Sequence, residues 1–230
     1  MVAGISVVTT CYNERENLQQ LIPAIRATLS GTLHEVVVVD DTSPDGTYEV
    51  ASRLADVAVS KEREGQTRGL ATGMRVAKYD TIVTIDSDLE NDPKWIPVLA
   101  SNLGDFDILV GSRRKLPRIS EKVFSIIYRR RLGVRDVLSN YRAYRASIIS
   151  LINPRQDETF GAEFLIRARQ HGLRIGEIVV DSQPRRRKPR IGNSVTANLR
   201  IFAALLRTLR IQATPTRDST PNGNCTRSEQ

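Results

Sequence analysis

The sequence predicts an α/β fold built on a doubly wound, mostly parallel sheet. Short apolar runs rich in β-branched residues recur along the chain, and helical patterns alternate with them. The clearest run, residues 81–85, shows no polar alternation, which is typical of a parallel strand buried on both faces. Strands that alternate with helices favour a parallel sheet covered by helices on both faces.

Six strands and six helices follow from these patterns. We expect strands at residues 5–10, 35–39, 57–59, 81–85, 107–110 and 174–180. Helices are expected at about 14–29, 47–54, 67–77, 92–103, 120–132 and 159–171. Asn13 is the expected cap of the first helix, and Pro23 is expected to kink the helix or shift its boundary. Asp92 before Pro93 predicts another helix start, Gly172 predicts a helix end, and residues 136–144 look irregular.

Composition limits the compartment and the partners. The 230-residue chain carries a net charge of +8, which suggests an anionic partner. Two cysteines make no disulfide framework, the N-terminus does not resemble a signal peptide, and no apolar run approaches the roughly 20 residues that span a bilayer. We therefore expect a cytoplasmic protein. Aromatic residues are only 5% and no nucleic-acid motif occurs, so nucleic acid is not an expected partner.

The chain divides into three parts. Residues 1–195 hold the strand–helix repeats and form the expected catalytic domain. Residues 196–211 form a basic helical pattern with an apolar stripe, suited to a membrane interface or to docking on the protein's own core. Residues 212–230 are rich in Thr, Pro, Asn, Ser and Arg, and are expected to be disordered.

Two carboxylates follow the strand at residues 81–85. Asp86 and Asp88 are alternate residues at its carboxyl end, where open α/β sheets bind ligands, so both can face one ion. Paired carboxylates suit Mg²⁺ or Mn²⁺ together with substrate phosphates. The alternative is a solvated acidic turn. Further polar residues close other predicted strands and should meet at the same edge, namely Tyr12, Glu14, Asp40, Asp41 and Arg113.

Four ordered motifs carry a resemblance to a known family. They are Thr-Cys-Tyr-Asn-Glu at residues 10–14, Asp-Asp-Thr-Ser-Pro-Asp-Gly-Thr at 40–47, Asp-Ser-Asp at 86–88 and Gly-Ser-Arg at 111–113. Together they resemble the inverting GT-A glycosyltransferases, and most of all the dolichol-phosphate mannose synthase branch, over roughly residues 4–195. The resemblance implies a Rossmann-like GT-A sheet, a nucleotide-diphospho-sugar donor and a Mg²⁺ or Mn²⁺ cofactor.

The resemblance also implies roles for individual residues. Nucleotide-binding positions are Thr10, Tyr12, Glu14, Asp40, Asp41, Asp86 and Ser87, and metal ligands are Asp86 and Asp88. Asp88, Arg113, Arg142 and Glu163 are the candidates for the catalytic centre. The chain departs from the family where Asn140 replaces a glycine, Val195 replaces a lysine, and Thr10-Cys11 replaces a segment with proline. These departures leave the base and the sugar open.

The predicted reaction moves a sugar, mannose or glucose, from the donor to a polyprenyl or dolichyl phosphate with inversion. Such an acceptor is already an anion and needs orientation more than deprotonation. Arg129, Arg130, Arg131, Arg187 and Arg190 are the candidates to hold its phosphate. The protein is then expected to rest peripherally on the cytosolic membrane face, with a membrane protein as a further candidate partner.

Three other functions compete with this one. Transfer to a hydroxyl of a glycolipid or glycan would need a general base, for which Glu163 or Asp157 are candidates. A nonenzymatic basic module would bind nucleic acid or anionic membrane in a salt-sensitive way. A nucleotidyltransferase would also use paired carboxylates and metal, but would release pyrophosphate.

Overall fold

The computed structural model describes residues 2–114, 116, 119–151, 160–182 and 203. Several predictions fall outside this part of the chain. They are the tail at 212–230, Asp157, Arg187, Arg190 and, apart from Ala203, the basic helix at 196–211.

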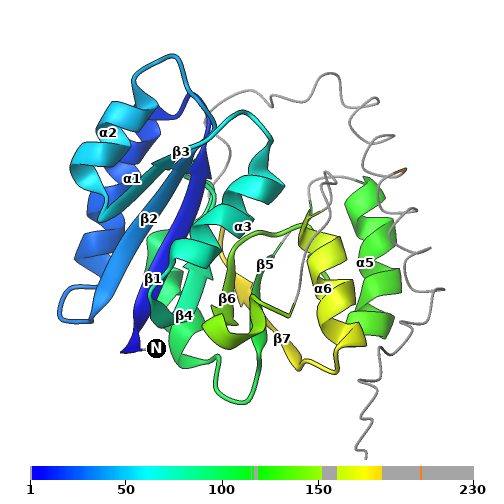
Figure 1. The fold of residues 1–230 in the computed structure, drawn as a ribbon. Helices are drawn as coiled ribbons and strands as arrows, with labels where there is room; N and C mark the ends of the chain where they lie inside the picture. The colour runs from blue at the N-terminus through cyan, green and yellow to red at the C-terminus, as the bar shows by residue number, and fades with distance from the viewer. Residues whose placement is uncertain (1, 115, 117–118, 152–159, 183–202, 204–230) are drawn as a thin grey trace, which may run out of the picture.

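A seven-stranded sheet forms the centre of the molecule (Figure 1). Its order is β3-β2-β1-β4-β6-β5-β7, and β6 alone runs antiparallel to its two neighbours. The prediction of a mostly parallel sheet is therefore confirmed. The strands are β1 (Val2–Cys11), β2 (His34–Asp40), β3 (Val57–Ser60), β4 (Tyr79–Thr84), β5 (Ile108–Arg113), β6 (Arg142–Arg145) and β7 (Ile175–Val180).

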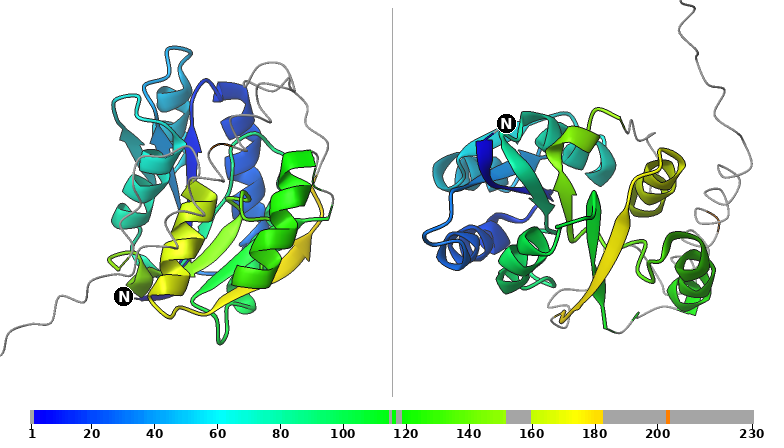
Figure 2. Two further views of the ribbon diagram at one scale, coloured as in Figure 1. Left: turned by 90° about the vertical axis from the view of Figure 1, so that its right-hand side faces the viewer. Right: turned by 90° about the horizontal axis from the view of Figure 1, so that it is seen from below.

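Helices cover both faces of this sheet (Figures 1 and 2). One face is packed by α1 (Arg15–Thr28), α2 (Thr47–Leu54) and α4 (Ile96–Ser101). The other is packed by α3 (Gln66–Val76), α5 (Ile119–Leu132) and α6 (Phe160–Gln170). Two 3₁₀ turns, η1 (Pro93–Trp95) and η2 (Ala146–Ile148), complete the described elements.

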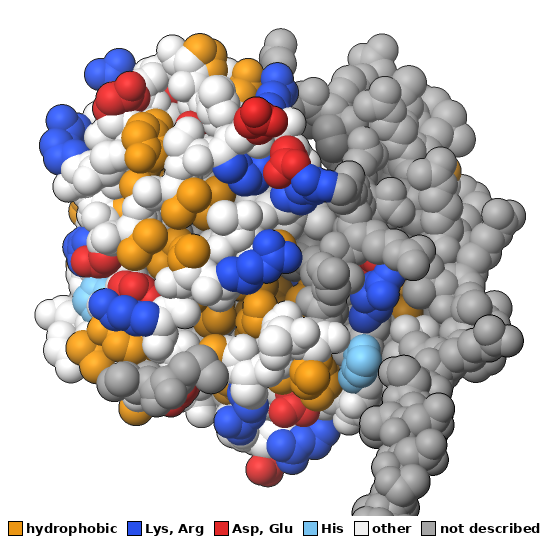
Figure 3. All heavy atoms as spheres, in the orientation of Figure 1, with side chains coloured by type: hydrophobic (Ala, Val, Ile, Leu, Met, Phe, Trp, Pro, Cys, Tyr) orange, Lys and Arg blue, Asp and Glu red, His pale blue; other side chains and the backbone are white. Residues whose placement is uncertain are grey.

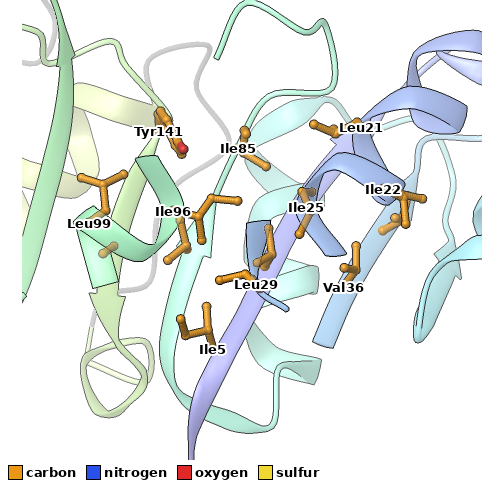
Figure 4. Close-up of a cluster of buried hydrophobic side chains, with 14 of the residues drawn as sticks. Ile5, Leu21, Ile22, Ile25, Leu29, Val36, Ile85, Ile96, Leu99 and Tyr141 are labelled. Atoms are coloured by element: carbon orange, nitrogen blue, oxygen red, sulfur yellow. The ribbon is translucent and has the colours of Figure 1, made fainter. Parts of the chain in front are cut away.

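Each face has its own apolar core. Figure 4 shows the α1 side, where Leu21, Ile22 and Ile25 pack toward Ile5 and Val36 of the sheet. All three helix residues are at most 1% exposed, and burying each contributes about 1.5–3 kcal/mol. They share one side of α1 because their spacing follows the helical repeat. This packing holds α1 against β1 and β2.

Two glycines of α3 face the sheet and allow the helix to pack closely against β1. A Cβ atom on Gly73 would lie 2.4 Å from Val8 Cγ1, and one on Gly69 would lie 2.7 Å from Thr10 Cγ2. No larger side chain fits there without a shift of helix or strand. The beginning of α3 is thereby held against the carboxyl end of β1.

Three local predictions need correction. Asn13 does not cap α1: it has a φ of 56°, the cap position belongs to Glu14, and no side chain supplies a cap bond. The backbone N–H of Asn13 instead donates to Ser43 Oγ at 2.9 Å. A contact between two loops thus takes the place of the local cap. Pro23 lies within α1, which continues beyond it to Thr28, so the helix boundary is not shifted to Pro23. The stretch expected to be irregular contains β6, whose four residues are too few for a clear periodic signal.

Candidate active site

The carboxyl ends of β1, β2, β4 and β5 meet at one edge of the sheet. Cys11 of β1 pairs in register with Asp40 of β2, and Val8 pairs with Thr84 of β4. Beyond β4, Ser87 Oγ donates to the carbonyl oxygen of Thr10 at 2.9 Å. This bond fastens the Asp86–Asp88 segment to the end of β1, as the predicted convergence requires.

Asp86 is an acid whose surroundings oppose its charge. Burial, reinforced by the nearby carboxylate of Asp88, raises the pKa of Asp86 to about 7. Gln66 Nε2 donates to Asp86 Oδ1 at 2.7 Å, and the polar side chain of Asn140 partly offsets the rise in pKa. Within the part of the chain that the structure describes, Asp86 makes no ion pair with Lys or Arg. A cation at this position would relieve the repulsion.

Asp88 and Ser87 complete the motif. Asp88 is half-buried, and its Oδ1 accepts a hydrogen bond from the Glu90 amide at 3.1 Å. Ser87 is 7% exposed and turns inward to Thr10. No group of three or more His, Cys, Asp or Glu side chains suited to a metal occurs among the described residues. Two carboxylates are enough for Mg²⁺ or Mn²⁺ when phosphates and water supply the other ligands, so these residues fit such an ion.

The acidic pair after β2 is tied to its own loops. Asp40 is 1% exposed and accepts hydrogen bonds from the amide and the hydroxyl of Ser43. Asp41 accepts from Lys61 Nζ at 2.6 Å and from the amides of Glu64 and Gly65 at 3.0 and 2.9 Å. Burial alone would raise the pKa of Asp41, but these bonds outweigh it and lower the pKa. Nucleotide contacts by the two aspartates remain a prediction.

Tyr12 and Glu14 lie beside this pair. The Arg63 guanidinium lies 4.0 Å from the centre of the Tyr12 ring, and its Nη1 donates to the Tyr12 hydroxyl at 3.2 Å. Glu14 is 6% exposed, its amide donates to Thr47 Oγ1 at 3.0 Å, and its carboxylate accepts from Asn17. Arg63 therefore covers one face of the Tyr12 ring, and Glu14 is held in place by Thr47 and Asn17.

Arg113 is paired with carboxylates. Its Nε and Nη2 donate to the two oxygens of Asp136 at 2.7 and 2.9 Å, and Nη2 also lies 3.4 Å from Glu121. These two carboxylates raise the pKa of Arg113 although burial alone would lower it. Arg113 still lowers the pKa of Asp86 through its charge. Arg113 therefore contributes positive potential to this edge of the sheet. Its Nε and Nη2 are bound to Asp136 and Glu121, and its Nη1 takes no part in these bonds.

Two other predicted catalytic residues are enclosed by protein. Arg142 is 0% exposed, its Nη2 donates to the Val137 carbonyl at 2.9 Å, and its Nε and Nη1 have no hydrogen-bond partner among the described residues. Glu163 is 1% exposed, and its Oε1 accepts from both Nε and Nη2 of Arg167 at 2.8 Å. Neither side chain lies on the surface around Asp86.

The predicted acceptor arginines of α5 lie far along their helix. Glu121, which contacts Arg113, is in the first turn, whereas Arg129, Arg130 and Arg131 are exposed in the last turn. Eight to ten residues of helix separate the two ends by about 12–15 Å. On the face shown in Figure 3, basic and acidic side chains of the described residues are intermingled rather than gathered into one basic patch.

Gln66 and Asp136 contact predicted site residues but were not themselves among the predicted site residues. Gln66 follows Gly65 at a helix start, yet nothing in the sequence pairs it with Asp86. Asp136 was placed in an irregular segment, and its partner Arg113 lies 23 residues away. These are tertiary contacts.

Comparisons with known proteins agree with the motifs. The model of the family "Glycosyl transferase family 2" matches residues 6–147. A dolichol-phosphate mannosyltransferase of Pyrococcus furiosus is 40% identical over 115 residues, covering 47% of this chain and 33% of that protein. An undecaprenyl-phosphate 4-deoxy-4-formamido-L-arabinose transferase of Pseudomonas savastanoi pv. phaseolicola is 30% identical over 201 residues. The match covers 79% of this chain and 58% of the transferase. The chain thus spans between a third and three fifths of these two relatives.

A solved structure supports the fold independently. Glucosyl-3-phosphoglycerate synthase of Mycobacterium tuberculosis, crystallised with Mn²⁺, uridine diphosphate and glucosyl-3-phosphoglycerate, superposes with a TM-score of 0.74 at 23% identity, covering 91% of this chain and 80% of that one. None of the described helices is both long and apolar enough to cross a bilayer. From the four ordered motifs, the GT-A arrangement of the sheet and the family match, we conclude that this chain belongs to glycosyltransferase family 2.

Proposed function

We propose that this chain transfers a hexosyl group, mannose or glucose, from a nucleotide-diphospho-sugar to a polyprenyl or dolichyl phosphate, with inversion. The observation that carries the proposal is the Asp86–Asp88 pair at the carboxyl end of β4 in a family 2 chain. Relatives named for transfer to dolichol phosphate and undecaprenyl phosphate support the acceptor class. The work would take place at the cytosolic face of a membrane.

Asp86 and Asp88 would hold Mg²⁺ or Mn²⁺ against the donor diphosphate. When bound, the ion would supply Lewis-acid stabilisation of the leaving diphosphate. Asp40, Asp41, Tyr12 and Glu14 would frame the nucleoside, with the aromatic face of Tyr12 offered to the base once Arg63 moves aside. Thr10 and Ser87 would position this edge through the bond that joins them.

Arg113 would add positive potential beside the diphosphate. Because Asp136 and Glu121 occupy most of its donors, its contribution would be mainly that of a fixed charge. The acceptor phosphate would be held by arginines, for which Arg129, Arg130 and Arg131 of α5 and the predicted Arg187 and Arg190 are the candidates. An acceptor that is already ionised needs no general base.

A hydroxyl acceptor is the competing function, and Glu163 was a candidate base for it. Its burial and its bidentate pairing with Arg167 disfavour that role. Transfer to a lipid phosphate thus uses residues at the carboxyl edge of the sheet, whereas transfer to a hydroxyl would depend on Glu163, a buried carboxylate of α6.

A transfer assay tests the proposal. The protein is incubated with Mn²⁺, dolichyl or undecaprenyl phosphate, and radiolabelled GDP-mannose or UDP-glucose, and the lipid phase is extracted. A labelled lipid product that disappears with EDTA supports the proposal. Label found only in water-soluble glycan, release of pyrophosphate in place of nucleoside diphosphate, or no transfer from either donor contradicts it.

A further inference from the structure

Asp86 and Arg113 lie at the same level of the carboxyl edge, beside the ends of two strands that β6 separates. Arg142, the first residue of β6, pairs with Thr84 of β4 on one side and with Val110 of β5 on the other. Asp86 comes two residues after Thr84, and Arg113 comes three residues after Val110. The two strands are two strand spacings apart, roughly 10 Å. The acid and the base therefore lie on either side of the beginning of β6.

The segment that leads into β6, residues 136–140, is bonded to both of these strands. Thr84 Oγ1, at the end of β4, donates to the Asn140 carbonyl oxygen. Ser139 Oγ donates to the carbonyl oxygen of Gly111 in β5 at 2.7 Å. The segment therefore braces the end of β4 against the end of β5.

Asp136, the first residue of this segment, holds Arg113 through three hydrogen bonds. Its Oδ2 accepts from the backbone N–H of Arg113 at 3.2 Å and from Nε at 2.7 Å, and its Oδ1 accepts from Nη2 at 2.9 Å. A guanidinium that is bound at two points by one carboxylate has a fixed plane as well as a fixed position. Asp136 is 2% exposed, so it is shielded from water. The direction of the Arg113 side chain is therefore set by the segment that braces the two strands.

Part of the Arg113 side chain stays available to a ligand. The side chain is 19% exposed, and its Nη1 takes no part in the bonds to Asp136 and Glu121. The charge of Arg113 also lowers the pKa of Asp86, against the larger effect of burial, which agrees with the closeness that the register requires. Phosphate oxygens accept charge-assisted hydrogen bonds from guanidinium nitrogens. The exposed part of Arg113 therefore suits a phosphate group at this edge.

We propose that Asp136 is a positioning residue, which holds Arg113 in the orientation that binds a phosphate group of the reaction. The inference rests on the proposed function, because it presumes that the donor diphosphate and the lipid phosphate meet at this edge. When the charge of Asp136 is removed, Glu121 remains as a carboxylate partner, since its Oε2 lies 3.4 Å from Arg113 Nη2. Arg113 then turns toward α5, and the reaction loses a correctly placed cation although Arg113 itself is present.

The test asks whether Asp136 acts through Arg113. The kcat/KM for sugar transfer is measured for wild type, Asp136→Asn, Arg113→Met and the double variant, at a temperature at which circular dichroism shows each to be folded. Asp136→Asn is expected to lower kcat/KM about 10- to 100-fold in the wild-type background and to have no further effect beside Arg113→Met. The substrate whose KM rises more, nucleotide sugar or lipid phosphate, identifies the phosphate that Arg113 binds. Asp136→Glu keeps the charge and displaces the contact by one methylene, and it takes the place of Asp136→Asn if that variant does not fold.

Glu35→Gln is the matched control, since Glu35 is also a buried carboxylate, 1% exposed, but lies at the amino end of β2 and so at the opposite edge of the sheet. It accepts hydrogen bonds from the Ser6 hydroxyl and the Lys78 backbone N–H, so its loss is expected to lower the melting temperature and leave kcat/KM unchanged. An unchanged kcat/KM in Asp136→Asn, or an equal loss in both backgrounds, overturns the inference and leaves the proposed function standing. A wild type that transfers no sugar to lipid phosphate overturns the proposed function itself, and the inference with it.

Discussion

Asp40-Asp41 after β2 and Asp86 with Asp88 after β4 are both acidic pairs at the end of a parallel strand, yet their surroundings differ. Asp41 is surrounded by donors, among them the ammonium group of Lys61 at 2.6 Å, and its pKa is lowered. Asp86 accepts a hydrogen bond from the neutral side chain of Gln66, and burial together with the carboxylate of Asp88 raises its pKa to about 7, although the charge of Arg113 acts in the opposite direction. Asp41 lies where the protein stabilises its charge, and Asp86 lies where the protein does not.

The difference separates a structural carboxylate from a ligand-binding one. A stabilised acid can order loops, as Asp41 does for residues 61–65 through three hydrogen bonds. A buried carboxylate that is repelled by a second carboxylate lowers the stability of the protein until a cation binds. Asp86 therefore belongs to the second kind, and the following predictions contrast it with Asp41.

The largest expected effect is on activity. Asp86→Asn and Asp88→Asn should each reduce metal-dependent transfer on the order of 10³-fold, about 4 kcal/mol of transition-state stabilisation, because the ion loses a charged ligand. Initial rates at fixed Mn²⁺ measure this. Asp105→Asn, at a side chain that is 99% exposed, is the control and should retain full activity. Variants that keep more than a tenth of the activity would contradict the metal role.

Asp41→Ala should instead destabilise the fold, by about 2–3 kcal/mol, because it leaves Lys61 and two amides without their acceptor. Urea denaturation followed by circular dichroism measures the change. Since the pKa of Asp41 is lowered in the folded state, its contribution is fully present above the unfolded pKa of about 3.9 and is lost as pH falls through the folded value. An effect no larger than that of Asp105→Ala would remove the contrast between the two pairs.

Asp86→Asn should have the opposite sign and stabilise the metal-free protein by up to about 4 kcal/mol at pH 8, since the folded and unfolded pKa values differ by about 3 units. The folded pKa of about 7 lies above the unfolded value, so the native state holds the proton more tightly and wild-type stability falls as pH rises from 4 to 7. The advantage of the variant should vanish near pH 4. Thermal melting in EDTA at several pH values measures it, and equal melting at pH 8 would contradict a strained Asp86.

The smallest effect concerns the thiol beside the β2 pair. Cys11 is 5% exposed, and burial together with the charge of Asp40 raises its pKa far above the ordinary value. In a Cys225→Ser background, Cys11 should react with Ellman's reagent only after unfolding. Because burial is the larger cause, Asp40→Asn should leave the native thiol protected. Rapid reaction of Cys11 in the native protein would show that the carboxyl end of β1 opens in solution.

The sequence predicted the framework of the site because the signals are local. A buried parallel strand is a continuous apolar run, and its end can be read from the first charged residue, as at Ile85-Asp86. Six of the seven strands were found in this manner, whereas β6 was missed because four residues with arginine at both ends carry no hydrophobic period. The predicted cap at Asn13 was wrong because the backbone N–H of Asn13 instead contacts Ser43, 30 residues away, and this contact outweighs the local capping preference.

By itself, then, the sequence determined the α/β class, the ordered motifs and the placing of Asp86 and Asp88 after a buried strand. Only the tertiary structure decided that the charge of Asp41 is stabilised and that of Asp86 is not, because this depends on distant segments: Lys61 donates to Asp41, whereas Asp86 is buried beside Asp88 and accepts from the neutral side chain of Gln66. It also decided that Arg113 pairs with Asp136 and that Glu163 pairs with Arg167. Charge and hydrogen bonding act through space, and a one-dimensional pattern does not carry those distances.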